Sequence, residues 1–230
     1  MQGLVNQLLP AIALNKLRHQ DFQFNKRELT DEFEDVTILF ADIKGFTEFS
    51  DKVKNPKKVL KMLKDLFEGF DKLCLKNKVF KLYTIGDCYV VLSFVVAERQ
   101  NTTEEKIQEA KNVVNMGLEM IETISHVRKD YTFLNMRIGI HTGKKIIGGI
   151  LGTHVVRYDV YGNDIRIANK MESSGEPAKV MISQSTKDWI EKEQNHNYSI
   201  VWAKEVQIKS KGKSTEIIQS YFINKKAYYQ

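Results

Sequence analysis

The sequence predicts an α/β (α+β) protein with a ferredoxin-like βαββαβ sandwich core and further elements after the core. Three observations predict this fold class. Apolar residues recur at strand-like and helix-like spacings, in the order strand, helix, two strands, helix, strand. Gly, Pro and Asn residues stand where the spacing changes. The 230 residues, 42% hydrophobic and 28% charged, suffice for one domain and an appendage.

The expected elements of the first half are, in order, a strand at 35–42, helices at 45–53 and 56–76, and strands at 78–83 and 87–96. In the second helix, apolar residues repeat at helical spacing between Val59 and Phe70, and Pro56 suits a first turn. A turn at Gly86 joins the two short strands. This turn places Asp87 beside the end of the first of them.

The expected elements of the second half are a helix at 103–129 and strands at 135–140 and 145–150. Thr102 or Thr103 can cap the helix. The C-terminal additions follow, with turns near Pro177 and at 195–197. We expect a largely antiparallel sheet with the helices on one face, and no domain boundary after residue 33.

The N-terminal segment carries an apolar stripe at helical spacing, formed by Leu4, Leu8, Leu9, Ile12, Leu14 and Leu17. We therefore divide the chain into an N-terminal helix with linker at 1–32 and a domain at 33–230. The helix can connect the domain to an upstream region, or it can pack on its own domain. The pattern does not choose between these two readings.

Cysteine usage and hydropathy indicate a cytoplasmic domain. Cys74 and Cys88 form no disulfide framework and suit a reducing compartment. No apolar run reaches the roughly 18–20 residues that span a bilayer, and there is no signal-peptide pattern. The net charge is +6, but the lysines are scattered along helices and tails. We interpret most of them as a solvated face and expect no nucleic-acid partner.

Two aspartates carry the strongest functional signal, because each ends an apolar run in the first half of the chain. Asp42 ends the run that begins at Val36, and Asp87 ends the run that begins at Lys81. Two carboxylates from neighbouring strands suit Mg²⁺, which takes one or two protein carboxylates and fills its other positions with water and phosphate. Gly45 and the helix that follows it favour an anion such as a triphosphate. The pattern therefore predicts nucleotide chemistry.

Four segments resemble successive signature segments of class III adenylate and guanylate cyclase catalytic domains. They are Phe40–Thr47, Ile85–Tyr89, Met136–Gly143 and Tyr158–Met171. The resemblance extends over roughly residues 33 to 223, and the order and spacing of the four segments make it specific. It implies the ferredoxin-like core of the cyclase fold and an enzyme that forms a cyclic nucleotide from ATP or GTP.

The resemblance also implies roles for individual residues. Asp42, Asp87 and the carbonyl of Ile43 match the group that holds two Mg²⁺ or Mn²⁺ ions, and Arg137 matches an arginine that contacts phosphate. The implied substrate contacts on this side are Lys44, Gly45, Phe46, Thr47 and Gly86. The implied reaction is an in-line attack of the ribose 3′-oxygen on the α-phosphorus, with pyrophosphate as the leaving group.

This sequence departs from the family where a complementary half is expected. Arg166 and Lys170 stand at the positions of an asparagine and an arginine that act on the ribose and the transition state. Tyr83 stands at a base-reading position, Asp159 falls where an aspartate reads adenine, and Lys209 resembles a lysine that meets phosphate. The chain is therefore most similar to the metal-bearing first half of two-part membrane cyclases, whose active site lies between two domains.

Several alternatives remain open. Asp159 favours ATP over GTP, but a guanylate cyclase half would look similar. A non-catalytic regulatory or dimerisation module would also explain Tyr83, Arg166 and Lys170. The expected partner is a complementary cyclase domain or a second copy of the chain, and membrane attachment is expected only through parts outside this chain.

Overall fold

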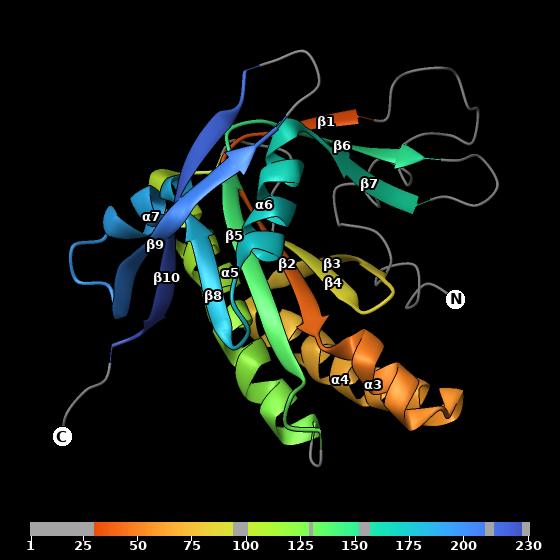
Figure 1. The fold of residues 1–230 in the computed structure, drawn as a ribbon. Coiled ribbons are helices and arrows are strands. Elements are labelled where there is room, and N and C mark those ends of the chain that lie inside the picture. The colour runs from red at the N-terminus through yellow and green to blue at the C-terminus, as the bar shows by residue number, and fades with distance from the viewer. Residues whose placement is uncertain (1–29, 94–100, 129–130, 152–156, 210–213, 227–230) are drawn as a thin grey trace, which may run out of the picture.

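The computed structural model describes residues 30–93, 101–128, 131–151, 157–209 and 214–226 (Figure 1). The large sheet has seven strands in the order β3-β4-β2-β5-β8-β10-β9, and a small sheet has three in the order β1-β6-β7. The strands of the large sheet are β2 (Val36–Lys44), β3 (Val79–Ile85), β4 (Cys88–Ser93), β5 (Asn135–Gly143), β8 (Lys179–Ser183), β9 (Tyr198–Ile208) and β10 (Glu216–Lys225). Those of the small sheet are β1 (Thr30–Phe33), β6 (Ile146–Leu151) and β7 (Arg157–Tyr161). The helices are α3 (Phe46–Val53), α4 (Pro56–Asn77), α5 (Thr103–Val127), α6 (Asn163–Ser174) and α7 (Gln184–Glu191).

The predicted βαββαβ core is confirmed. It runs from β2 through α3 and α4 to β3 and β4, and then through α5 to β5, and its four strands lie in the order β5-β2-β4-β3. The sheet is antiparallel throughout except for the pairing of β5 with β8. The Thr102 side chain and Glu105 form a capping box at the start of α5. β5 continues past the expected end at 140 to Gly143, because its ladder with β2 extends to the pair Val36–Gly143.

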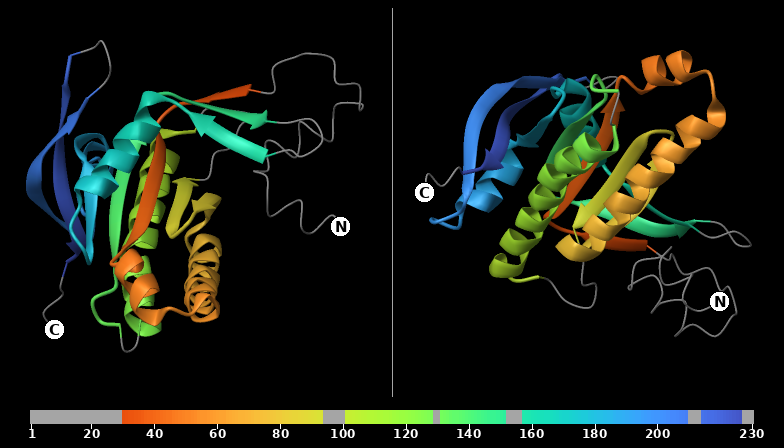
Figure 2. Two further views of the ribbon diagram at one scale, coloured as in Figure 1. Left: turned by 45° about the vertical axis from the view of Figure 1, so that its right-hand side comes forward. Right: turned by 90° about the horizontal axis from the view of Figure 1, so that it is seen from below.

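Four helices cover one face of the large sheet. Leu39, Ala41 and Ile43 of β2 point into a core that also contains Leu66 of α4 and Met116 of α5. Residues of α3 and α7 pack into the same core. Figure 2 shows α4 and α5 lying side by side across this face.

The helices of the predicted core lie on one face as expected, whereas α6, which follows the core, lies on the other face. Ile38 and Phe40 of β2 point to the opposite face, where they pack with Tyr158 and Val160 of the small sheet and Ala168 of α6. β2 is apolar on both faces, and a strand buried on both sides needs a layer on each side. The small sheet and α6 supply the second layer (Figure 1).

α6 lies against β5 with almost no space between their backbones. A Cβ atom at Gly139 would stand 1.9 Å from the backbone nitrogen of Glu172, so only glycine fits at this position. The Glu172 side chain binds Arg137 on one side of Gly139, and Asp164 binds His141 on the other. α6 therefore runs antiparallel to β5 and is attached to it near both of its ends.

Two sequence expectations concern the N-terminal segment and membrane spans. The N-terminal helix expected within 1–32 lies outside them, apart from residues 30–32, which begin β1. Among the described residues, no helix is both long and apolar enough to cross a membrane.

Replacing Gly139 by alanine should destabilise the protein by about 3 kcal/mol or more, because the added methyl group forces α6 away from β5. Urea unfolding monitored by circular dichroism measures the effect. Gly117→Ala is the matched control, since its Cβ would contact only side chains of β2 and β5 at 3.3–3.4 Å. Its change should stay within about 1 kcal/mol. Equal losses in the two variants would contradict the close packing of α6.

Candidate functional site

Asp42 and Asp87 meet at one end of the large sheet. Asp42 lies near the end of β2, and the pairing of β2 with β4 continues from Ala41 opposite Tyr89 toward the turn that holds Asp87. The Ile43 amide donates a hydrogen bond to the Asp87 carboxylate, which therefore sits beside the end of β2. The sheet brings together two carboxylates that stand 45 positions apart in the chain (87 − 42).

The charges at this end of the sheet are mutually repulsive. Partial burial and the Asp42 carboxylate raise the pKa of Asp87. Burial, together with Asp42, Glu172 and Asp87, raises the pKa of the neighbouring Cys88 thiol to about 12. Negative charge thus gathers without enough positive charge to balance it, and a bound cation would relieve the repulsion.

The donor set fits a hard cation that keeps part of its water. Among the described residues, no group of three or more His, Cys, Asp or Glu side chains is arranged to hold a metal ion. Two carboxylates and nearby backbone oxygens are nevertheless what Mg²⁺ usually takes from a protein, since water and substrate phosphates supply the remaining ligands. Asp42 and Asp87 therefore fit Mg²⁺ or Mn²⁺ and do not fit a fully protein-coordinated structural metal.

Arg137 lies directly opposite Asp42 in the pairing of β2 with β5. Its Nη2 donates to Asp42 Oδ2 at 3.3 Å, and its Nε donates to Glu172 Oε1 at 2.6 Å. The guanidinium is mostly buried, and Glu172 is only 5% exposed. Arg137 is thus held in one orientation beside the carboxylate pair.

Glu172 is a residue of this site that the sequence interpretation missed. It comes one position after the family-like segment that ends at Met171. Burial and the Asp42 and Asp87 carboxylates raise the pKa of Glu172, and Arg137 opposes that rise. A detectable signal was present, because Glu172 shares the buried face of α6 with Ala168 and Met171, and a carboxylate on such a face needs a cationic partner.

The residues after Asp42 form an uncapped helix start. Gly45 adopts a left-handed conformation with φ of 89° and precedes α3, and no side chain caps the helix there. The first amides of α3, including those of Phe46 and Thr47, therefore have no side-chain acceptor at the cap position. Lys44 is exposed beside them, and Gly86 is exposed in the turn that carries Asp87. Backbone donors and carboxylates thus converge on the same end of the sheet, which suits a metal-bound polyphosphate.

A second group of expected residues lines a different feature, an open groove of about 810 Å³ between α6 and β9. Arg166, Lys170 and Lys209 all line it, so the structure brings these three together. Arg166 Nη2 donates to the backbone oxygen of Lys209 at 2.9 Å. Asp42, Asp87 and Arg137 are not among the residues that line this groove.

Tyr83 and Asp159 form a third group. Burial and the nearby Asp159 carboxylate raise the pKa of Tyr83. Asp159 is buried and accepts hydrogen bonds from Arg157 Nη2 at 2.7 Å and from the Val160 amide at 2.9 Å. Its carboxylate is therefore held in place by neighbours on β7, with Tyr83 of β3 close by.

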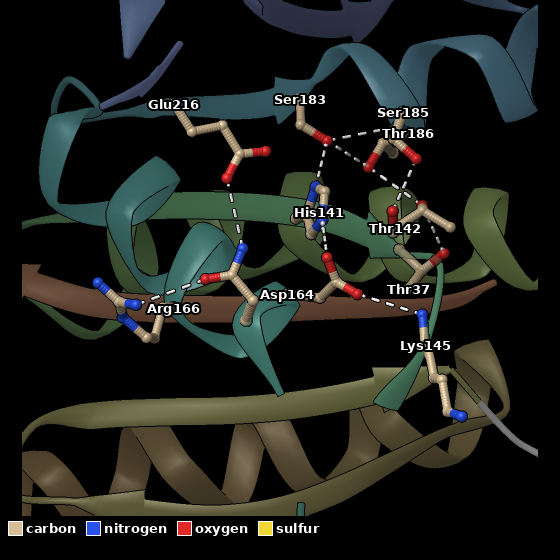
Figure 3. A network of polar contacts seen from close by, with 11 residues as sticks. Thr37, His141, Thr142, Lys145, Asp164, Arg166, Ser183, Ser185, Thr186 and Glu216 are labelled. Atoms are coloured by element: carbon tan, nitrogen blue, oxygen red, sulfur yellow. Dashed lines mark hydrogen bonds and ion pairs between the residues drawn. The ribbon is translucent and has the colours of Figure 1, made fainter. Parts of the chain in front are cut away.

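A buried polar network joins β5 to the start of α6 and to β8 (Figure 3). His141 Nδ1 lies 2.8 Å from Ser183 Oγ, and His141 Nε2 lies 3.2 Å from Asp164 Oδ1. The Lys145 amide donates to the second oxygen of Asp164 at 3.2 Å. Ser183 is fully buried and His141 is 5% exposed, so this arrangement cannot reach a substrate. It therefore fixes the position of α6 relative to β5 and β8.

Comparison with known proteins gives one consistent result. Residues 29–225 match the family model described as the adenylate and guanylate cyclase catalytic domain. The chain is 37% identical over 189 residues to guanylate cyclase alpha of Plasmodium falciparum, covering 81% of this chain and 4% of that protein. It is 39% identical over 159 residues to adenylate cyclase type 9 of Xenopus laevis, covering 69% of this chain and 12% of that protein.

A solved structure supports the same fold. The guanylate cyclase domain of RhGC from Catenaria anguillulae, determined in complex with GTP, superimposes with a TM-score of 0.68 at 27% identity. The match covers 86% of this chain and all of that one (100%). The present chain thus spans a whole catalytic domain but only a small part of the curated relatives it matches.

Replacing Asp87 by asparagine should stabilise the metal-free protein near neutral pH. Because the folded-state pKa of Asp87 is raised, its contribution to stability is full below the unfolded value of about 4 and is lost as pH rises through the folded value. Thermal unfolding in a chelator at about pH 8 should therefore give a higher Tm for Asp87→Asn than for wild type, with the gap closing toward about pH 4.

Divalent cations should reverse this difference. Mg²⁺ or Mn²⁺ should raise the Tm of the wild type more than that of Asp87→Asn, because the cation binds the native carboxylate pair. Asp65→Asn, at an exposed position of α4, is the matched control and should change neither value. A lower Tm for metal-free Asp87→Asn at about pH 8 would contradict the repulsion described here.

Proposed function

The chain belongs to the family of adenylate and guanylate cyclase catalytic domains, and we propose that it converts a nucleoside triphosphate to a 3′,5′-cyclic nucleotide and pyrophosphate. The observation that carries this proposal is the pairing of Asp42 with Asp87 beside the uncapped start of α3. A module that had only a structural role would have no need to keep two repelling carboxylates next to free helix amides.

The proposed metal ligands are Asp42, Asp87 and the backbone carbonyl of Ile43. Two Mg²⁺ or Mn²⁺ ions bound there would neutralise triphosphate charge and favour ionisation of the ribose 3′-hydroxyl. Aspartates suit this role because they present hard oxygen donors at the end of a rigid sheet.

The chain's own groups would bind and orient the triphosphate. The amides from Lys44 to Thr47 would donate to phosphate oxygens at the start of α3, and Gly86 would let the opposite turn approach closely. Arg137 is held by Glu172, so its remaining donors are oriented before substrate arrives. In the reaction, a bond forms between the 3′-oxygen and the α-phosphorus, and the bond from that phosphorus to the β-phosphate bridging oxygen breaks.

The second half of the site would come from another domain. Arg166, Lys170 and Lys209 line the groove between α6 and β9, away from the residues that line the carboxylate site of the same chain. In the proposed assembly, this groove would face the metal-binding side of the partner domain. The partner would be a complementary cyclase domain or a second copy of this chain.

We assign ATP as the preferred substrate on the basis of Asp159. An ionised carboxylate only accepts hydrogen bonds, and the 6-amino group of adenine donates them, whereas guanine presents a carbonyl oxygen at that position. Arg157 Nη2 and the Val160 amide donate hydrogen bonds to the Asp159 carboxylate and hold it in position. GTP is the alternative substrate, favoured by the similarity to guanylate cyclase alpha of Plasmodium falciparum and to a domain solved with GTP.

The chain would act as a cytoplasmic catalytic unit within a longer membrane protein. Its relatives are far longer than the matched region, since the match covers 4% of the full length of one relative and 12% of the full length of another. The segment that precedes β1 would then transmit a signal to the domain.

Cyclase activity should disappear when either proposed metal ligand is neutralised. With Mn²⁺ and ATP or GTP, Asp42→Asn and Asp87→Asn should each lower product formation by roughly 100-fold or more. Chromatographic detection of cyclic AMP and cyclic GMP measures the product and identifies the base. Asp65→Asn should retain full activity, and activity surviving in both site variants would sink the two-metal proposal.

The double substitution Arg166→Asn with Lys170→Arg should raise the activity of the isolated chain. It restores an asparagine and an arginine where the family uses them, and arginine offers a fixed fork of donors that lysine lacks. A silent wild type with an active double variant would identify the chain as a half-site. An active wild type would identify a working homodimer, and silence from both, even with a complementary domain, would favour a regulatory module.

A further inference from the structure

Six lysines gather at the corner where α3 meets α4. Residues 52–64 contain Lys52, Lys54, Lys57, Lys58, Lys61 and Lys64 and no acidic residue. All six are exposed. The interpretation of the lysines as scattered along the chain therefore fails for this corner, which alone carries as much positive charge as the net +6 of the whole chain.

Most of this charge is not neutralised within the protein. Lys52 pairs with Glu48, and Lys64 lies 3.6 Å from Glu68. Across the part of the chain that the structure describes, no carboxylate lies within ion-pair distance of Lys54, Lys57, Lys58 or Lys61. Like charges three or four positions apart on a helix destabilise it, by about 0.2–0.5 kcal/mol per pair. The corner is thus electrostatically unfavourable for the domain by itself.

An apolar groove lies among these lysines. It has a volume of about 380 Å³ between the end of α3 and the first turns of α4, and Pro56, Val59, Leu60 and Leu63 line it, with Lys54 at its border. Leu60 is 68% exposed and has Lys57 and Lys64 as its neighbours on the same helical face. A large exposed apolar side chain within a ring of cations is a typical composition for a binding surface.

Only part of this surface serves the packing of the fold: Val59 and Leu63 are partly buried and pack against the helical core, whereas Leu60 is exposed and does not. The buried residues of α4 are Leu66, Phe70, Cys74 and Asn77, all beyond its first two turns. Asn55 caps the helix by accepting from the Lys57 and Lys58 amides. Figure 2 shows that α3 and α4 lie at the border of the molecule, on the side away from β9 and β10. Leu60 and the lysines of these first turns are therefore accessible.

We propose that the α3–α4 corner binds an acidic amphipathic segment of a partner protein. An apolar side chain of that segment enters the groove beside Leu60, and its carboxylates lie against Lys54, Lys57, Lys58 and Lys61. Charge complementarity selects an acidic partner, because an occupant bearing carboxylates removes the repulsion among the lysines. The hollow between two helices selects a protein segment over a membrane, since a groove of this kind receives a projecting side chain.

A partner bound at this corner would lie on the helix whose start adjoins the carboxylate site. α3 begins immediately after Gly45, three positions beyond Asp42. Phe49 of α3 is buried and packs edge-on against Tyr131 at 4.7 Å, so α3 is tied to the core through this ring. A partner that shifts α3 therefore moves the backbone donors at its start. This consequence rests on the proposed function, whereas the binding itself does not.

The test uses a fluorescent synthetic helix of about five turns, with glutamates on one face and a stripe of leucine and phenylalanine on the other. A peptide of the same composition in scrambled order serves as the reference. Fluorescence anisotropy with the full chain should show micromolar binding of the amphipathic helix in low salt and at least tenfold weaker binding in about 0.5 M salt. The scrambled peptide should bind at least tenfold more weakly.

Two variants of α4 provide the matched comparison. Lys57→Glu with Leu60→Ser should weaken binding at least tenfold, because it removes a cation and the apolar contact together. Lys72→Glu with Leu75→Ser changes the same residue types at the other end of the same helix, where Leu75 is 82% exposed, and should leave binding unchanged. Circular dichroism should show both variants folded, since all four side chains are exposed.

Three outcomes would overturn the proposal. Equal binding of the ordered and scrambled peptides would reduce the effect to net charge. Equal losses in the two α4 variants would place the binding elsewhere. Binding to vesicles containing anionic lipid, with sensitivity to Lys57→Glu/Leu60→Ser and no binding of the peptide, would identify the corner as a membrane contact instead. These measurements do not require cyclase activity, so they separate this proposal from the assigned function.

Discussion

The backbone contact between α6 and β5 at Gly139 is the constraint on which the rest of the structure depends. No side chain fits between the two elements at this point, so the backbones of α6 and β5 lie in direct contact. The contact lets Glu172 reach Arg137 at one end and lets Asp164 reach His141 at the other. Because α6 also carries Arg166 and Lys170 on its outer side, the same contact positions both the carboxylate site and the groove.

The carboxylates of the proposed metal site repel one another and so destabilise the metal-free fold. Asp42, Asp87 and Glu172 crowd one end of the sheet, and burial makes their mutual repulsion stronger than it would be in water. Arg137 offsets part of this charge and is held rigid in doing so. A bound cation would neutralise the remaining negative charge. Metal binding would therefore stabilise the folded protein.

Three surfaces of the domain are incomplete by themselves. The carboxylate site has excess negative charge, the groove between α6 and β9 has three exposed or partly exposed cations, and the α3–α4 corner has uncompensated lysines around an apolar hollow. Unbalanced charge and exposed apolar area at three surfaces are expected of a domain that works within a larger assembly.

The sequence by itself determined the βαββαβ order and the meeting of Asp42 and Asp87, because apolar periodicity and strand ends are local patterns and neighbouring strands bring such ends together. The place of Arg137 beside them was expected only from the resemblance to the cyclase family. Only the tertiary structure decided that α6 covers the opposite face, that Glu172 joins the site, and that the lysines of residues 52–64 form one surface with a groove. The physical reason is the separation along the chain of the residues that make each contact. A helix's periodicity states that it has a buried face, whereas the layer it covers depends on contacts between residues far apart in the chain, such as Gly139 with Glu172.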